Sequence, residues 1–114
     1  MTITASCHCG LLRLDLAHAP LEVTDCNCSL CRRYGVLWAY YPAAAVIALP
    51  DAALTDTYAW NGRHVDFHRC RHCGCVSHWM PRDGRRDRRG INARLLPPEV
   101  LAAATVRLLD GASR

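Results

Sequence analysis

The sequence has no lysine, so its positive charge rests on 14 arginines set against 10 acidic residues, with a net charge of +4. Large apolar side chains are also scarce, since there is one phenylalanine and much of the 51% hydrophobic fraction is alanine. A chain of 114 residues with so few bulky side chains buries only a modest core and often needs cross-links. The mild positive charge suits an anionic small ligand as well as nucleic acid, so it assigns no function by itself.

Long apolar segments are missing too. No run reaches the roughly 18 residues of a membrane-spanning helix, and the first residues lack the basic and apolar regions of a secretory signal. We therefore expect a cytoplasmic protein without a membrane partner. In a reducing compartment, clustered cysteines bind metal more often than they form disulfides. The eight cysteines are accordingly candidate metal ligands.

Short apolar segments between turn residues predict a mostly β fold with one short helix. Residues 12–16 alternate leucine with polar side chains, which is typical of a half-buried strand. Asn61-Gly62 between two strand-like segments indicates a hairpin, and Pro97 and Pro98 favour the start of a helix that continues to Ala104. Without repeats or a dividing linker, residues 1–114 are expected to form a single domain. The predicted strands are 12–16, 36–41, 55–60, 65–68, 76–80 and 105–109.

The cysteines fall into three groups that differ in spacing. A C-x-x-C pair has the spacing of half a structural zinc site, which usually joins two pairs from distant parts of the chain. Gly74 permits the left-handed backbone of a tight metal-binding turn, and a bend at Gly10 would bring a C-x-C pair onto one metal. The groups are Cys7-His8-Cys9-Gly10, Cys26-Asn27-Cys28-Ser29-Leu30-Cys31, and Cys70-Arg71-His72-Cys73-Gly74 with Cys75 directly behind it.

The two outer groups are predicted to form one closed site. Cys7, Cys9, Cys70 and Cys73 offer the four thiolates that a structural zinc ion needs. Such a site would tie the N-terminal part of the chain to its middle. The alternative is that these four residues are buried thiols without a metal.

The middle group offers three thiolates within six residues. Cys26, Cys28 and Cys31 are predicted to bind a second zinc ion and to leave its fourth position open, the arrangement of a catalytic zinc. A fourth protein ligand, such as a histidine or Cys75, would instead make the site structural. The three thiols could also be redox-active without a metal.

Several other polar or aromatic residues could also have been taken as ligands. Cys75 is interpreted as a spare thiol, and the arginine-rich segment 82–89 as a solvated turn, with a phosphate-binding patch as the alternative. Asn92 either orients a ligand or completes a turn. The remaining residues are interpreted as core, pocket wall or spacer rather than as ligands: Trp38, Tyr40, Tyr41, His64, His68, His72 and His78.

These motifs resemble the family of glutathione-dependent formaldehyde-activating enzymes, whose domain is shared with centromere protein V. The resemblance covers nearly the whole chain, and seven cysteines at matching spacing make it specific. It rests on Ser6-Cys7-His8-Cys9-Gly10, Cys26-Asn27-Cys28-Ser29-Leu30-Cys31-Arg32-Arg33, Cys70-Arg71-His72-Cys73-Gly74, Gly90-Ile91-Asn92-Ala93-Arg94 and Val106-Arg107-Leu108-Leu109-Asp110-Gly111-Ala112.

The resemblance implies an Mss4-like fold of folded-over β-sheets. It implies two zinc ions per chain, one on the four outer cysteines and one on the middle three. The implied activity is that of a carbon–sulfur lyase, in which glutathione adds to formaldehyde and gives S-hydroxymethylglutathione. A small thiol such as glutathione is then the partner, and Arg32 and Arg33 are candidates for pairing with its carboxylates.

Two functions compete with this one. A non-enzymatic zinc module that contacts nucleic acid or a protein partner would suit the arginines and the cysteine pairs. Nucleic acid is the less expected partner, because aromatic residues are not interleaved with the arginines as stacking platforms require. A zinc or redox buffer without a dedicated substrate is the other alternative.

Overall fold

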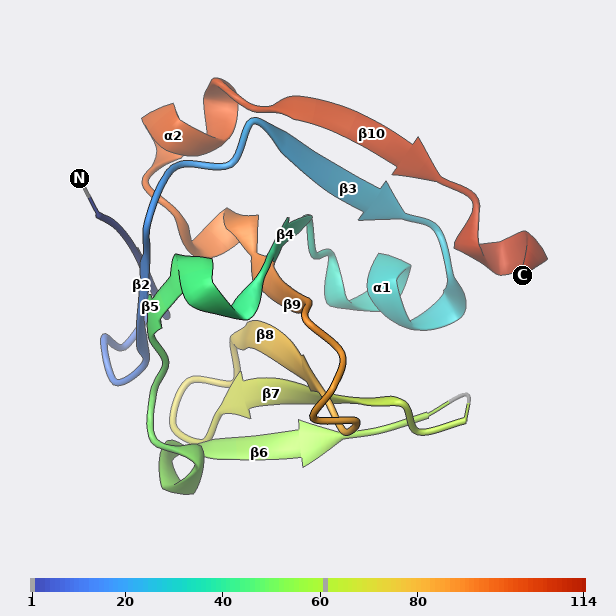
Figure 1. The fold of residues 1–114 in the computed structure, drawn as a ribbon, viewed down its shortest axis with the longest axis horizontal. Helices are drawn as coiled ribbons and strands as arrows, with labels where there is room; N and C mark the ends of the chain where they lie inside the picture. The colour runs from blue at the N-terminus through green and yellow to red at the C-terminus, as the bar shows by residue number, and fades with distance from the viewer. Residues whose placement is uncertain (1, 61) are drawn as a thin grey trace.

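The computed structural model describes residues 2–60 and 62–114, whose strands form two sheets (Figure 1). The smaller sheet has the order β1-β2-β5 and the larger has the order β10-β3-β4-β9-β8-β7-β6. β10 runs parallel to β3, whereas the other neighbouring strands are antiparallel. The strands are β1 (Ile3–Ser6), β2 (Arg13–Leu16), β3 (Glu22–Cys26), β4 (Trp38–Tyr41), β5 (Val46–Ala48), β6 (Thr55–Tyr58), β7 (Val65–Cys70), β8 (Val76–Pro81), β9 (Arg89–Asn92) and β10 (Thr105–Leu109).

Short helices occupy the connections. α1 (Ser29–Tyr34) joins β3 to β4, and α2 (Pro98–Ala102) precedes β10. Single 3-10 turns span Ala43–Ala45, Ala52–Leu54, Ala93–Leu95 and Gly111–Ser113. Within the described residues, no helix has both the length and the apolar character needed to cross a membrane.

β3 and β4 share a single register pair, Thr24 opposite Trp38, and the larger sheet bends there (Figure 1). Figure 1 shows β3 and β10 as one layer and β6, β7 and β8 as another, with α1 beside them. A hydrophobic cluster, separate from the main core described below, fills this region and joins Cys26 and Cys31 to Trp38, Phe67 and Trp79. The bend thus places the middle cysteine group where the two layers meet.

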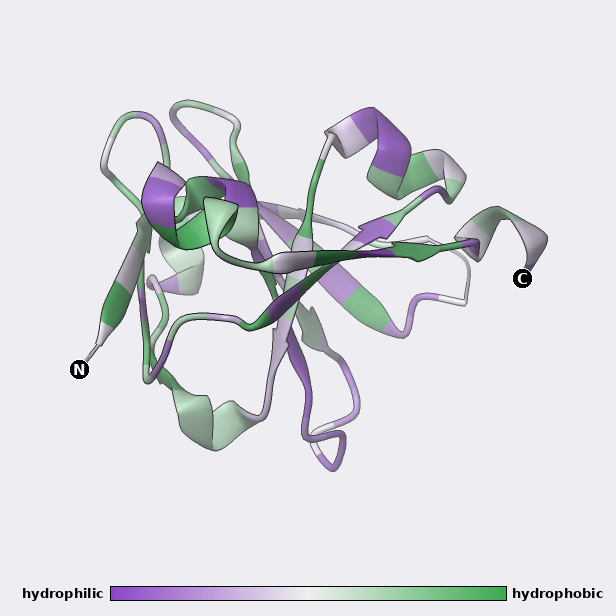
Figure 2. Ribbon diagram, turned by 90° about the horizontal axis from the view of Figure 1, so that it is seen from above, coloured by the Kyte–Doolittle hydropathy of each residue, from purple (hydrophilic) through white to green (hydrophobic). Residues whose placement is uncertain are grey.

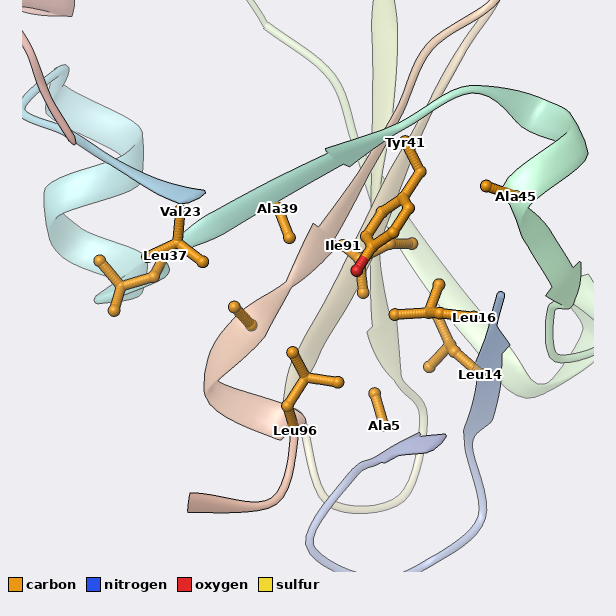
Figure 3. Packing of buried hydrophobic residues seen from close by; sticks show 11 residues of the cluster. Ala5, Leu14, Leu16, Val23, Leu37, Ala39, Tyr41, Ala45, Ile91 and Leu96 are labelled. Carbon is orange, nitrogen blue, oxygen red and sulfur yellow. The ribbon is translucent and has the colours of Figure 1, made fainter. Parts of the chain in front are cut away.

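The main hydrophobic core lies beside the smaller sheet. Figure 3 shows Leu14 and Leu16 of β2 together with Tyr41 of β4 and Ile91 of β9, and all four side chains are buried. The Tyr41 hydroxyl donates a hydrogen bond to the carbonyl oxygen of His18 at 3.0 Å, so its polar end is satisfied. Alternation along β2 therefore buries the leucines as the sequence pattern predicts.

The structure confirms the mostly β fold, which is consistent with the Mss4-like fold that the resemblance implies. All six predicted strands are present, five of them with shifted ends and 105–109 with both ends as predicted, and α2 lies within the predicted helix. The predicted hairpin is formed by β6 and β7, although Asn61 of its turn lies outside the described residues. The structure adds α1 and the strands β1, β3, β5 and β9.

The arginine-rich segment 82–89 forms the connection between β8 and β9. Figure 2 shows this connection as a strongly hydrophilic loop that extends from the body of the fold. Asp83 accepts hydrogen bonds from the backbone N–H and Nε of Arg85, and Asp87 accepts one from the N–H of Ala43. Residues 82–88 are exposed, as expected of a solvated turn, and both acidic side chains of the segment accept hydrogen bonds.

Candidate metal centres and the adjoining groove

The outer cysteine groups meet at one point although they are distant in the chain. Cys7 and Cys9 follow β1, whereas Cys70 and Cys73 lie at the turn between β7 and β8. The Sγ atoms of Cys7 and Cys70 each lie 3.6 Å from Sγ of Cys9, and all four sulfurs lie within 4.8 Å of one another. Zinc–sulfur bonds of about 2.3 Å in a tetrahedron place the sulfurs about 3.8 Å apart. This four-cysteine site therefore fits a closed structural metal ion.

Left-handed backbone shapes both turns of this site. Gly10 has φ 83° and Gly74 has φ 80°, values that side-chain-bearing residues rarely adopt. The N–H of Gly10 donates to the carbonyl oxygen of Cys7, and the N–H of Gly74 donates to that of Cys70. The two glycines thus close the turns that the cysteine spacing predicts.

Backbone N–H groups also stabilise negative charge on the sulfurs. The N–H groups of His72 and Cys73 both lie 3.4 Å from Sγ of Cys70. The pKa of Cys73 is lowered from 9.0 to about 5, chiefly because the N–H of Cys75 donates to its sulfur and then because that of Cys9 does. Hydrogen bonds to the charged form lower a pKa in this way. The turn therefore favours the thiolate that a metal ion binds.

The middle group forms a second, separate site. β3 ends at Cys26, Cys28 is the N-cap of α1, and Cys31 lies within the helix. Sγ of Cys28 accepts a hydrogen bond from the N–H of Cys31 at 3.3 Å, as the oxygen of an ordinary N-cap would. The three sulfurs lie within 4.8 Å of one another, and among the described residues no histidine or carboxylate joins them at that distance. This three-cysteine site thus has an unfilled fourth side.

The charge state of the three-cysteine site depends on a cation. Burial raises the pKa of Cys31 to about 12, although Nε1 of the buried Trp38 donates to its sulfur at 3.3 Å. Burial also opposes ionisation of Cys28, but hydrogen bonds led by the N–H of Cys31 lower its pKa overall. Because adjacent thiolates repel one another, all three ionise together only around a positive ion. Three sulfur ligands suit zinc, so the residues fit the implied metal.

The three-cysteine site opens onto two adjoining cavities. One has a volume of about 470 Å³ and the other about 310 Å³, both within the size range of small-molecule sites. Cys26 and Trp60 line both cavities, Cys28 lines the larger and Cys31 the smaller. Together these cavities form a groove whose walls include Trp38, Tyr40, Val65, Phe67, Trp79, Leu109, Gly111 and Ala112. The unfilled side of the site is therefore accessible to a small ligand.

Asn27 ties the C-terminal segment 109–114 to this site. Its backbone N–H donates to the carbonyl oxygen of Leu109 at 3.1 Å, and its Nδ2 donates to Oδ1 of Asp110 at 3.1 Å. Its Oδ1 accepts from the N–H of Ala112 at 2.9 Å. Figure 1 shows the C-terminal turn beside the connection between β3 and α1. Asn27 therefore holds one wall of the groove against the cysteines.

Gly111 makes the closest approach of that segment to the sulfurs. A Cβ atom at this position would lie 2.5 Å from Sγ of Cys26 and 3.2 Å from Cβ of Cys28. Only glycine fits without a shift of the segment or the sulfur. Sequence reasoning did not single out Asn27 or Gly111, although both lie within motifs that carried the family resemblance.

The arginines predicted to bind substrate lie elsewhere. Arg32 and Arg33 are exposed on α1, Nη1 of Arg33 donates to the carbonyl oxygen of Ser29, and neither residue lines the two cavities. Their pairing with a substrate carboxylate stays a prediction. Arg86 and Arg114 do line the groove, and the sequence pattern had assigned no ligand to Arg114.

The structure also shows the surroundings of Asn92, Cys75, His68 and His78, which the sequence left without an assigned role. Asn92 completes a turn: its Oδ1 accepts from the N–H of Arg94 and its Nδ2 donates to the carbonyl oxygen of Val76. Cys75 packs beside the four-cysteine site without being one of its four sulfurs. The rings of His68 and His78 stack with centroids 4.4 Å apart, outside both cysteine groups. Burial lowers the pKa of His78 to about 3, so this ring is a neutral core residue.

Comparisons with known proteins bear on the fold and on the family of the chain. A crystal structure of a Rhodobacter sphaeroides protein, solved as a structural genomics target, matches with a TM-score of 0.71 and 24% identity. The match covers 92% of this chain and 100% of that chain, and it supports the fold. The family model of the glutathione-dependent formaldehyde-activating enzyme matches residues 2–97. The chain therefore belongs to the glutathione-dependent formaldehyde-activating enzyme family.

Proposed function

We propose that the protein is a zinc-dependent enzyme of the carbon–sulfur lyase type that acts on the adduct of a small thiol and an aldehyde. The proposed reaction joins glutathione and formaldehyde into S-hydroxymethylglutathione. The observation that carries this proposal is a three-cysteine site whose unfilled side faces a groove of ligand size. Family membership supports the choice of thiol and aldehyde.

The two cysteine sites have different proposed roles. Zinc on Cys7, Cys9, Cys70 and Cys73 would be fully coordinated by protein and purely structural. Zinc on the three-cysteine site would supply a position where a substrate thiol is bound as its thiolate at neutral pH. The reaction would form one carbon–sulfur bond between that sulfur and the aldehyde carbon. The proton released by the thiol would end on the aldehyde oxygen.

The chain's own residues would orient the reactants and limit water. Nε1 of Trp38 donates to Sγ of Cys31, which fixes that sulfur and reduces its basicity. Trp60 and Phe67 give the groove apolar walls near the sulfurs. Gly111 and the segment around it cover the site from the other side. A reducing cytoplasm, as the sequence predicts, would keep the cysteines available for metal.

Exchange spectroscopy by NMR tests the proposal. With glutathione and formaldehyde, zinc-loaded protein should accelerate the interconversion of free and adduct forms. Cys28→Ser should remove the acceleration, whereas Cys75→Ser, which alters a thiol outside both cysteine groups, should retain it. The proposal is wrong if loaded protein leaves the exchange rate unchanged across several thiols and aldehydes.

A further inference from the structure

A third cavity, of about 340 Å³, extends the groove away from the cysteines. Arginines from three separate segments converge on it: two from the connection between β8 and β9, one from β10 and one from the C-terminal segment. This arginine cavity is lined by Tyr40, Trp79, Arg86, Arg88, Arg107, Leu109 and Arg114. No acidic side chain is among these lining residues.

The positive charge of the arginine cavity is largely uncompensated. Among the described residues, Arg86, Arg88 and Arg114 form no ion pair, while Nε of Arg107 lies 3.3 Å from a carboxylate oxygen of Glu22. Asp87, which lies between Arg86 and Arg88 in sequence, accepts a hydrogen bond from the N–H of Ala43 and forms no ion pair among the described residues. Three guanidinium groups around one cavity therefore attract an anion.

Two of these guanidinium groups are held in place by aromatic rings. The central carbon of Arg88 lies 3.9 Å from the ring centroid of Tyr40, and that of Arg86 lies 5.4 Å from the ring of Trp79. Trp79 is buried and Tyr40 is half-buried, so the rings are fixed supports. A stacked guanidinium keeps its edge N–H groups free for a carboxylate or phosphate. The arginines are thus positioned before a ligand arrives.

The arginine cavity is continuous with the three-cysteine site. Tyr40, Trp79, Arg86 and Arg114 also line the 310 Å³ cavity that Cys26 and Cys31 line. One ligand can therefore place its sulfur at the cysteines and an anionic group among the arginines. This arrangement has no counterpart at Arg32 and Arg33, which lie outside the groove.

From this geometry we infer that Arg86, Arg88, Arg107 and Arg114 form an anion subsite that recognises a carboxylate or phosphate on the body of the thiol substrate. The substrate class is then an anionic thiol, and neutral thiols of similar size lack the group that the arginines bind. The sulfur end of this inference rests on the proposed function. The anion end is independent of it, because it needs neither metal nor reaction.

Binding of a thiol-blocked ligand isolates the anion subsite. S-methylglutathione cannot ionise at sulfur, so its binding by calorimetry reports the carboxylate contacts. The double variant Arg86→Gln/Arg88→Gln should weaken this binding about tenfold or more, since charge-assisted hydrogen bonds are lost. The matched control Arg13→Gln/Arg71→Gln changes two exposed arginines that line none of the three cavities and should bind as the wild type does. Equal weakening in both variants, or in neither, overturns the inference.

Further probes identify the anion. Competition by inorganic phosphate against S-methylglutathione supports a subsite that accepts phosphate, and competition by acetate alone supports a carboxylate subsite. The diethyl ester of S-methylglutathione, which lacks both carboxylates, should bind at least tenfold more weakly to the wild type. A short single-stranded oligonucleotide that binds more tightly than these probes, and is weakened by the same double variant, overturns the inference in favour of nucleic-acid contact.

The test separates this inference from the proposed function. If S-methylglutathione binds in an arginine-dependent way but wild-type protein does not accelerate thiol exchange, the proposed reaction is refuted and the anion subsite is not. If acceleration is equal for anionic and neutral thiols and is unchanged in Arg86→Gln/Arg88→Gln, the anion subsite is refuted and the proposed reaction is not.

Discussion

Replacing Gly111 with alanine should weaken metal binding at the three-cysteine site. The added methyl group would lie 2.5 Å from Sγ of Cys26, whereas ordinary van der Waals contact begins at 3.4 Å. Either the sulfur or the C-terminal segment must then move by roughly 1 Å. Asn27 holds that segment through three hydrogen bonds, and the sulfur is fixed when it binds metal, so neither moves freely.

The expected size of the effect follows from the cost of overpacking. Inserting a methyl group into a filled site costs about 1–3 kcal/mol. If this cost falls on the metal-bound state, affinity at the three-cysteine site drops by about 5- to 150-fold. The four-cysteine site lies on other turns and should keep its affinity. Gly111→Ala should therefore lower the metal affinity of one site and leave that of the other unchanged in the same measurement.

Competition with a chromogenic chelator measures both affinities. Wild-type protein should release its ions in two phases, and only the more labile phase should shift in Gly111→Ala. Gly84→Ala is the matched control, because a Cβ at this exposed loop position meets nothing within 4 Å. Unchanged affinities at both sites in Gly111→Ala, within about twofold, would refute the close packing of the segment against the sulfur.

Three further changes test the remaining assignments. Cys70→Ser should abolish cooperative thermal unfolding, because structural zinc contributes about 10 kcal/mol or more to folding, whereas Cys26→Ser should still unfold cooperatively by circular dichroism. Trp38→Phe removes the donor to Cys31 and should weaken metal binding there by about 1.5–3 kcal/mol in chelator competition; an unchanged affinity would dismiss that hydrogen bond.

The local parts of the candidate site could be predicted from the sequence. The spacing of Cys70 and Cys73, with Gly74 behind them, determines a tight turn that needs no information from the rest of the chain. The same holds for the three thiols of the middle group, which converge within one short segment. Strong alternation along β2 likewise determined which side chains are buried, since successive residues of a strand point to opposite faces.

Other parts of the site depend on pairing between distant segments. β10 lies beside β3 through a parallel register that joins Leu109 to Cys26, and no local pattern encodes such a pairing. That pairing brings Asn27 and Gly111 together over the sulfurs. It was therefore the tertiary structure that revealed this wall of the groove.

The same distinction applies to charge. The sequence determined that the protein is arginine-rich and that its cysteines form a set of four and a set of three, because counts and spacings are properties of the chain. It could not determine which arginines face the cysteines. Arg32 and Arg33 are nearest in sequence but lie on the outer surface of α1, whereas Arg86 and Arg114 reach the groove from distant segments. Only the tertiary structure decided this, since these two arginines lie on the connection between β8 and β9 and on the C-terminal segment, both distant in sequence from the middle cysteine group.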